Sequence, residues 1–164
     1  MKVYSKDNIE TARQMFKNLF YRLNKVNVAG KKLEFFDIPQ QRNPDLPCFA
    51  YVCAGKKEDG YVIGVSDEVY EPYKKLWAFH EFVEYAENGA DNKIRCIDAL
   101  DIELCAASIE LVSANAFRRY VAARKEFFEN LVKYVREKPD QYTQSDISEY
   151  EESLALLVRL NASS

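Results

Sequence analysis

Three short apolar segments between residues 32 and 66, set between longer segments with helical periodicity, constrain the fold of this chain most strongly. Residues 32–38 and 61–66 are rich in aromatic or β-branched side chains, which are typical of strands. Residues 48–54 form a nearly continuous apolar run, as expected for a strand that is covered on both faces. The polar residues 55–60 begin and end with glycine, so we expect the last two strands to form a hairpin.

Helical patterns precede and follow these strands, because apolar residues recur there at the spacing of one helix face. The expected helices cover about residues 8–25, Ser66 or Asp67 to Asn88, Asp91 or Asn92 to Leu111, Phe117 to before Pro139, and Ile147 to Val158. Residues 116–162 are expected to form a C-terminal helical hairpin. The sequence therefore predicts an α+β fold with a small, mostly antiparallel, three-stranded sheet, an N-terminal helix and a helical C-terminal half.

The composition is that of an ordinary globular protein of 164 residues, with 48% hydrophobic and 30% charged residues, and it predicts a single domain, residues 1–164. The formal net charge of −3 gives no excess of basic side chains, so nucleic-acid binding is not expected. No apolar run approaches the roughly 20 residues of a membrane span, and the N-terminus becomes polar too early for a secretory signal. We expect a cytoplasmic protein in which Cys48, Cys53, Cys96 and Cys105 are reduced, buried thiols.

The segment Leu76–Tyr85 contains the only histidine of the chain, His80. At about 100° per residue, Glu84 lies roughly 40° and Glu81 roughly 100° from His80 around a helix, so all three side chains can reach one small volume. Two ligands at positions i and i+4 can bind one divalent metal ion, and the intervening acid can polarise a water molecule. An open zinc site needs a third protein ligand, and Glu103 is the best candidate because it lies at the border of the buried stripe of its own helix.

The order of elements and this partial motif resemble the zincin metallopeptidases, in particular the compact gluzincin-like members. The resemblance covers about residues 6–115. In this range the helix that follows bears an acid, Glu103, 19 residues after Glu84. It implies that His80 and Glu84 are the two helix ligands, that Glu81 is the general base and that Glu103 is the third ligand. The protein would then be a metal-dependent hydrolase acting on a peptide or protein, or its inactive descendant. Because Glu84 replaces the second histidine of the family, the metal preference shifts from zinc toward iron or manganese.

The sequence leaves several alternatives open. His80 and Glu84 at this spacing also form a plain hydrogen-bonded pair with a structural role. A di-iron site needs a Glu-x-x-His pair on each of two helices, which one histidine does not provide. Cys96 or Cys105 near His80 would form a thiolate pair, but nothing in the sequence places either cysteine at a helix N-terminus or beside a base. The competing functional class is an interaction or scaffold protein whose helices pack against a partner or a second copy of the chain.

Two further expectations concern the surroundings of the histidine. If Glu81, Glu84 and Glu103 converge, their mutual repulsion should raise the pKa of at least one of them. The nearby aromatic residues are expected mainly in the core, whereas Trp77 is expected to line the site because it shares the arc of His80. These aromatic residues are Tyr70, Tyr73, Trp77, Phe82 and Tyr85.

Overall fold

The computed structural model describes residues 2–40, 46 and 49–163. Its helices and strands, in chain order, are α1 (Lys6–Asn18), β1 (Leu23–Val28), β2 (Lys31–Ile38), β3 (Ala50–Ala54), β4 (Tyr61–Ser66), α2 (Glu71–Glu81), α3 (Cys96–Glu110), α4 (Ala114–Arg136) and α5 (Gln144–Ala162). The short turns are η2 (Lys57–Asp59), the π-helical turn η3 (Phe82–Ala86) and η4 (Ala90–Asn92). The predicted α+β class is confirmed.

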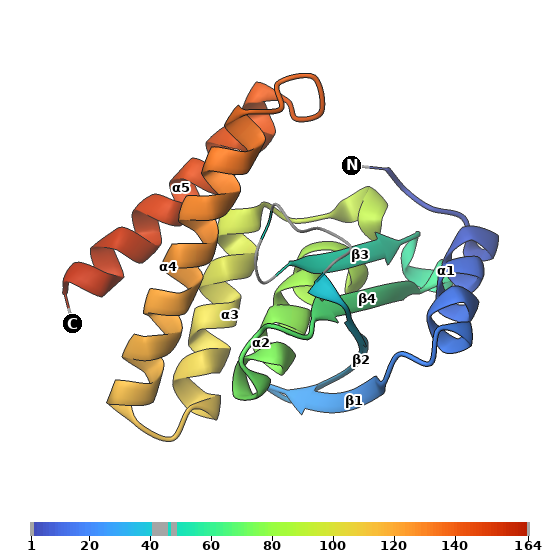
Figure 1. Cartoon of the computed structure of the whole chain (residues 1–164), viewed down its shortest axis with the longest axis horizontal. Helices are drawn as coiled ribbons and strands as arrows, with labels where there is room; N and C mark the ends of the chain where they lie inside the picture. Colours follow the sequence, from blue (N-terminus) through green and yellow to red (C-terminus); the bar gives the residue numbers. More distant parts are fainter. Residues whose placement is uncertain (1, 41–45, 47–48, 164) are drawn as a thin grey trace.

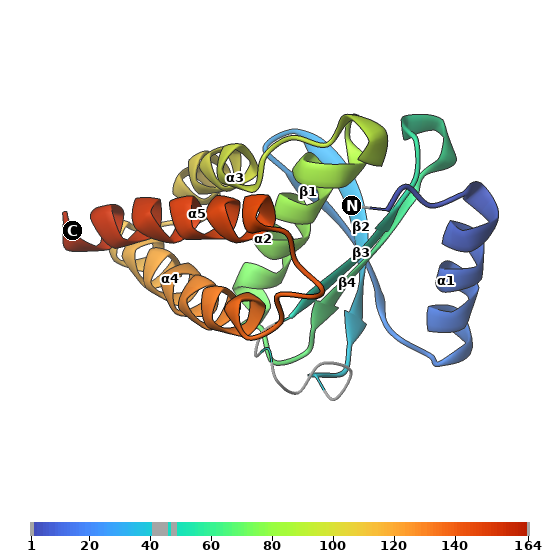
Figure 2. The same ribbon diagram turned by 90° about the horizontal axis from the view of Figure 1, so that it is seen from above.

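The sheet lies between α1 on one face and the other helices on the opposite face (Figures 1 and 2). Figure 2 shows α2 next to the sheet, with α3, α4 and α5 beyond it. The hydrophobic core divides accordingly. Phe16 of α1 packs with Phe36 and Cys53 on one side, whereas the larger cluster on the other side includes Leu76 and Leu100. This larger cluster surrounds the segment that carries His80.

Within the described residues the sheet has four strands rather than the three that the sequence predicts. Its order is β1-β2-β4-β3, in which β1/β2 and β3/β4 are antiparallel and β2/β4 are parallel. Residues 23–25, expected in the first helix, belong to β1 instead, because α1 ends at Asn18. Strand β1 joins β2 through Ala29–Gly30, with φ values of 50° and 79°, as a type I′ hairpin turn requires. Most side chains of β1 are half-buried or exposed, which explains its weak apolar signal.

The helix predicted to run to Asn88 consists of two parts. Helix α2 ends at Glu81, and the chain continues as the π-helical turn η3, in which the Glu87 N–H donates to the Phe82 carbonyl. Such turns are rare and often occur at functional sites. Because a π-helical turn is wider than an α-helical one, the angle of about 100° per residue does not hold through Glu84.

Helix α3 begins at Cys96, later than the predicted start at Asp91 or Asn92. Gly89 has a φ of 88°, and the residues that follow it form the separate turn η4. The backbone N–H of Cys96 is therefore one of the donors that a helix leaves unpaired at its N-terminus. This start places a thiol at a helix N-terminus, which the sequence analysis did not anticipate.

Helices α4 and α5 run in opposite directions and pack against each other (Figure 1). Among the helices described, none combines the length and the apolar character that crossing a membrane requires.

Candidate metal centre

His80 lies in the last turn of α2, is 3% exposed, and contacts a different carboxylate with each ring nitrogen. Its Nδ1 is 2.7 Å from Oε2 of Glu103, and its Nε2 is 3.0 Å from Oε2 of Glu84. Because the two ring nitrogens face opposite edges of the imidazole, the two carboxylates lie on opposite sides of it. The structure thus brings the three predicted ligands together but does not place both acids at one nitrogen.

Glu103 is fully buried, and hydrogen-bond donors surround it. Arg124 Nη2 donates to Oε2 over 2.9 Å, and the Tyr120 hydroxyl donates to Oε1. Arg124 Nε lies 2.8 Å from Oε1 as an ion-pair contact without hydrogen-bond alignment. Burial opposes ionisation, but the charge of Arg124 and the hydrogen bonds from His80 and Tyr120 lower the pKa of Glu103 below its usual value. An ionised carboxylate only accepts, so we assign the Nδ1 hydrogen of His80 to this contact.

Cys96 adds a third donor atom on the Nε2 side of the histidine. Its Sγ is 3.7 Å from His80 Nε2, and its side chain is buried. A nitrogen of His80, a carboxylate oxygen of Glu84 and Sγ of Cys96 all lie within 4.8 Å of one another. From the sequence, Cys96 is expected to be a buried thiol or a nucleophile beside His80, not a metal ligand. No spacing rule identifies it as a ligand, because its approach to His80 depends on how α3 packs against α2.

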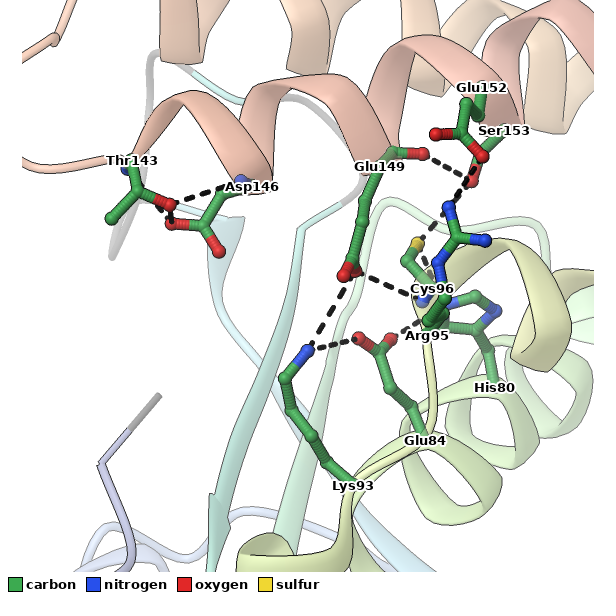
Figure 3. A network of polar contacts seen from close by, with 10 residues as sticks. All are labelled: His80, Glu84, Lys93, Arg95, Cys96, Thr143, Asp146, Glu149, Glu152 and Ser153. Atoms are coloured by element: carbon green, nitrogen blue, oxygen red, sulfur yellow. Dashed lines mark hydrogen bonds and ion pairs between the residues drawn. The ribbon is translucent and has the colours of Figure 1, made fainter.

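Helix α5 holds Cys96 in place (Figure 3). Glu149 accepts a hydrogen bond from the backbone N–H of Cys96 over 3.2 Å, which satisfies a free donor at the start of α3. The Ser153 hydroxyl donates to Sγ over 3.6 Å. Lys93 forms ion pairs with both Glu84 and Glu149. Its Nζ lies 4.0 Å from Oε1 of Glu84 and 3.8 Å from Oε2 of Glu149. The positions of the donor atoms thus depend on residues from α2, η3, α3 and α5.

The two other cysteines that the structure describes lie outside this group. Cys53 is buried, as predicted, whereas Cys105 is exposed, so the expectation of a buried thiol is wrong for Cys105. Cys48 lies outside the residues that the structure describes.

A cavity of about 170 Å³ is lined by His80, Glu81, Glu84 and Cys96, together with mainly aromatic and aliphatic side chains that include Trp77. Burial raises the pKa of Glu81 to about 7, while the nearby charges of His80 and Glu84 act in opposite directions. Burial is therefore the main cause, and the repulsion between carboxylates that the sequence predicted contributes less, through Glu84 and Glu103. Glu81 and Trp77, which the sequence placed beside the histidine, both border this cavity.

The acids and the thiol together favour positive charge at their centre. Burial disfavours the charged imidazole, but hydrogen bonds with Cys96, Glu103 and Glu84 outweigh it and raise the pKa of His80 well above its usual value. Burial also raises the pKa of the Cys96 thiol, although His80 acts in the opposite direction. A cation that binds between these groups would compensate the charge of the donors and take the place of their protons.

Comparisons with protein-family models, with curated proteins and with solved structures found no match to this chain. The resemblance to the zincins stays a prediction, as does the ligand set of His80, Glu84 and Glu103.

Proposed function

We propose that the protein binds one divalent transition-metal ion, preferably zinc, through His80, Glu84 and Cys96. The observation that carries the proposal is the convergence of an imidazole nitrogen, a carboxylate oxygen and a thiol sulfur. With zinc–ligand distances of about 2.0–2.3 Å, the ligand atoms of a tetrahedral ion lie roughly 3.3–3.8 Å apart. The distances from Nε2 of His80, 3.0 Å to Oε2 of Glu84 and 3.7 Å to Sγ of Cys96, are close to this range.

In this proposal Glu103 orients His80 and does not bind the ion. A histidine that ligates a metal usually donates its other ring N–H to a carboxylate, which fixes the ring and increases its basicity. The 2.7 Å contact between Nδ1 and Glu103 has this form. Binding an ion through Glu103 would instead require it on the Nδ1 side, where Arg124 already compensates the charge of the carboxylate. The proposed ligand set therefore replaces Glu103 of the sequence prediction with Cys96.

Cys96 also changes the expected ion. One imidazole with two carboxylates is an oxygen-rich set, which favours iron or manganese. One imidazole with one carboxylate and one thiolate is softer and suits zinc, which accepts nitrogen, oxygen and sulfur ligands in tetrahedral sites.

We further propose that the site serves hydrolysis of a peptide or protein, as the zincin resemblance implies. Three protein ligands leave one position of a tetrahedral zinc ion for water or substrate. Zinc in such a site supplies Lewis acidity, which lowers the pKa of water to about 7. Glu81 borders the same cavity as the three ligands, and we assign its carboxylate the role of accepting a proton from water there. Glu81 would act in this way as a general base without contacting the ion.

Metal content tests the proposal directly. After incubation with zinc and desalting, elemental analysis should find about one zinc per chain, and His80→Gln and Cys96→Ser should each abolish this binding. Glu81→Gln is the matched control, because it alters the neighbouring cavity residue without removing a ligand. This variant should keep the ion and lose hydrolysis of a mixed peptide library.

Cobalt(II) supplies a second measurement. A thiolate ligand produces a sulfur-to-cobalt charge-transfer absorption, which should be present in the wild-type protein and absent in Cys96→Ser. Protein that stays metal-free after incubation with zinc, manganese and iron would refute the proposal. That result would leave thiol chemistry at Cys96 and the scaffold alternative, for which the protein should be larger than a monomer in solution.

A second candidate function uses Cys96 as a nucleophile. His80 contacts Sγ through Nε2 and Glu103 through Nδ1, so Cys96, His80 and Glu103 have the order of a nucleophile, a base and an orienting acid. The start of α3 at Cys96 also favours a thiolate, because a helix N-terminus stabilises negative charge. Glu84 disfavours this function, since its carboxylate lies at the same nitrogen. Activity that resists a chelator and is lost on alkylation of Cys96 would support it over the metal site.

A further inference from the structure

A second cavity, of about 210 Å³, lies between the beginning of α2 with its preceding loop and the middle of α4. The proposed metal chemistry does not use it. Four aromatic residues and two glutamates contribute to its lining, and no lysine or arginine does so among the residues described. These six residues are Tyr70, Tyr73, Trp77, Phe127, Glu68 and Glu126.

The aromatic rings that line this cavity form edge-to-face pairs and do not stack face to face. The ring centroids of Tyr70 and Tyr73 are 4.9 Å apart, with an angle of 80° between the ring planes. Those of Trp77 and Phe127 are 4.7 Å apart, with an angle of 68°. In such edge-to-face pairs the edge of one ring points at the face of the other, so the two ring planes are roughly perpendicular. The face of an aromatic ring carries partial negative charge.

The charged groups around the cavity favour a cation. Glu68 and Glu126 are exposed, so their carboxylates add negative charge at the rim. Arg119 acts electrostatically on Tyr73, but it does not line the cavity. The guanidinium of Arg124 lies 4.2 Å from the centroid of the Trp77 ring, so the indole already accepts one cation. That charge is compensated, because Arg124 forms its ion pair with Glu103.

We propose that this second cavity binds an alkylated ammonium group. Aromatic walls attract quaternary ammonium ions electrostatically, and the methyl groups of such ions tolerate the loss of water contacts. The cavity is smaller than the roughly 300–1,000 Å³ typical of sites for whole drug-sized ligands, so it fits one group of a larger molecule. A small metabolite with a trimethylammonium group and a trimethylated lysine of a protein share this chemistry.

The experiment relies on Trp77, which is the only tryptophan of the chain. Choline is titrated into the protein while the fluorescence of Trp77 and the NMR signal of its indole N–H are recorded. Its uncharged analogue, in which carbon replaces the nitrogen, has the same shape and serves as the matched ligand. Choline should cause a saturable change, and the analogue should bind at least about 5-fold more weakly because it lacks the attraction between the cation and the rings.

Variants connect this change to the cavity. Tyr70→Leu removes an aromatic face at a residue that is 64% exposed, so the fold should persist, and Glu126→Gln removes one charge at the rim. Each should weaken the binding of choline about 5-fold. Glu129→Gln is the control, because Glu129 lies on the same helix but pairs with Lys125 and does not line the cavity. Its affinity for choline should be that of the wild type.

Two peptides identify the source of the ammonium group, one with a trimethylated lysine and one with the same lysine unmodified. Tighter binding of the trimethylated peptide than of choline assigns the cavity to a protein ligand, and the reverse order assigns it to a small molecule. Equal binding of choline and its uncharged analogue would overturn the proposal. So would the absence of any change in both Trp77 signals with choline and with the trimethylated peptide.

Discussion

Replacing Glu103 with glutamine removes the negative charge at the centre of a buried polar network. Glu103 is 0% exposed and Arg124 is 2% exposed, and their closest charged atoms are 2.8 Å apart. Glutamine keeps the size of the side chain and one acceptor oxygen. Its amide NH₂ group, however, would donate where the second carboxylate oxygen now accepts a hydrogen bond, so it would face another donor. The substitution therefore leaves Arg124 as a buried cation without a counterion.

The expected loss of stability follows from this burial. Removing one partner of a buried ion pair destabilises a protein by about 3–5 kcal/mol, because the other charge stays in a medium of low polarity. For a chain of this size each kcal/mol lowers Tm by roughly 2–4 °C, so Glu103→Gln should lower Tm by about 6–20 °C. The total free energy of unfolding of a domain is about 5–15 kcal/mol, so the variant should fold but with a small margin.

Urea denaturation followed by circular dichroism measures this loss without screening the charges. The midpoint should decrease while the dependence on urea concentration stays unchanged, because the surface exposed on unfolding is the same. Glu110→Gln is the matched control in the same helix. Glu110 pairs with Lys75 at 2.5 Å, but their side chains are 22% and 34% exposed, so its loss should cost less than about 1 kcal/mol.

A double variant separates the ion pair from the other contacts of Glu103. If the unpaired charge causes the loss, adding Arg124→Met to Glu103→Gln should destabilise the protein less than the sum of the single changes. A cost for Glu103→Gln within about 1 kcal/mol of that for Glu110→Gln would refute the reasoning. It would mean that water or rearranged side chains solvate Arg124.

Three further predictions concern stability. Gly89→Ala should lower the free energy of unfolding, measured with urea, by more than about 2 kcal/mol. Gly89 has a φ of 88°, and an added Cβ would lie 2.6 Å from a backbone nitrogen. Gly30→Ala should cost only about 1 kcal/mol, because Gly30 has a φ of 79° but open space around it. Zinc at about 100 times its Kd should stabilise the wild type by about 2.7 kcal/mol. In thermal unfolding scans of His80→Gln, the Tm should be the same with and without zinc. Thr143→Ala removes the N-cap of α5 and should cost about 1 kcal/mol, measured as faster hydrogen exchange in its first turn.

Several features of this protein follow from residues that are close together along the chain. The polar segment 55–60, which begins and ends with glycine, predicts the hairpin that β3 and β4 form, and β4 covers the expected residues 61–66. The contact between His80 and Glu84 follows from a spacing of four residues, which brings side chains together even though a π-helical turn contains Glu84. The contact of Glu103 with the same histidine was also expected from the sequence, although Glu103 is fully buried and not at the border of a buried stripe.

Tertiary structure decided what depends on segments that are distant in sequence. The assignment of residues 23–25 to β1 required the neighbouring strand, because a half-exposed strand has little apolar periodicity of its own. The parallel pairing of β2 with β4 joins strands that are not consecutive along the chain, so no local pattern specifies it. The packing of α3 against α2 put Glu103 at one ring nitrogen of His80 and Cys96 at the other, where Glu84 already lies. Helical periodicity specifies which face of a helix a residue occupies. Only the packing of whole helices specifies which atoms on those faces meet.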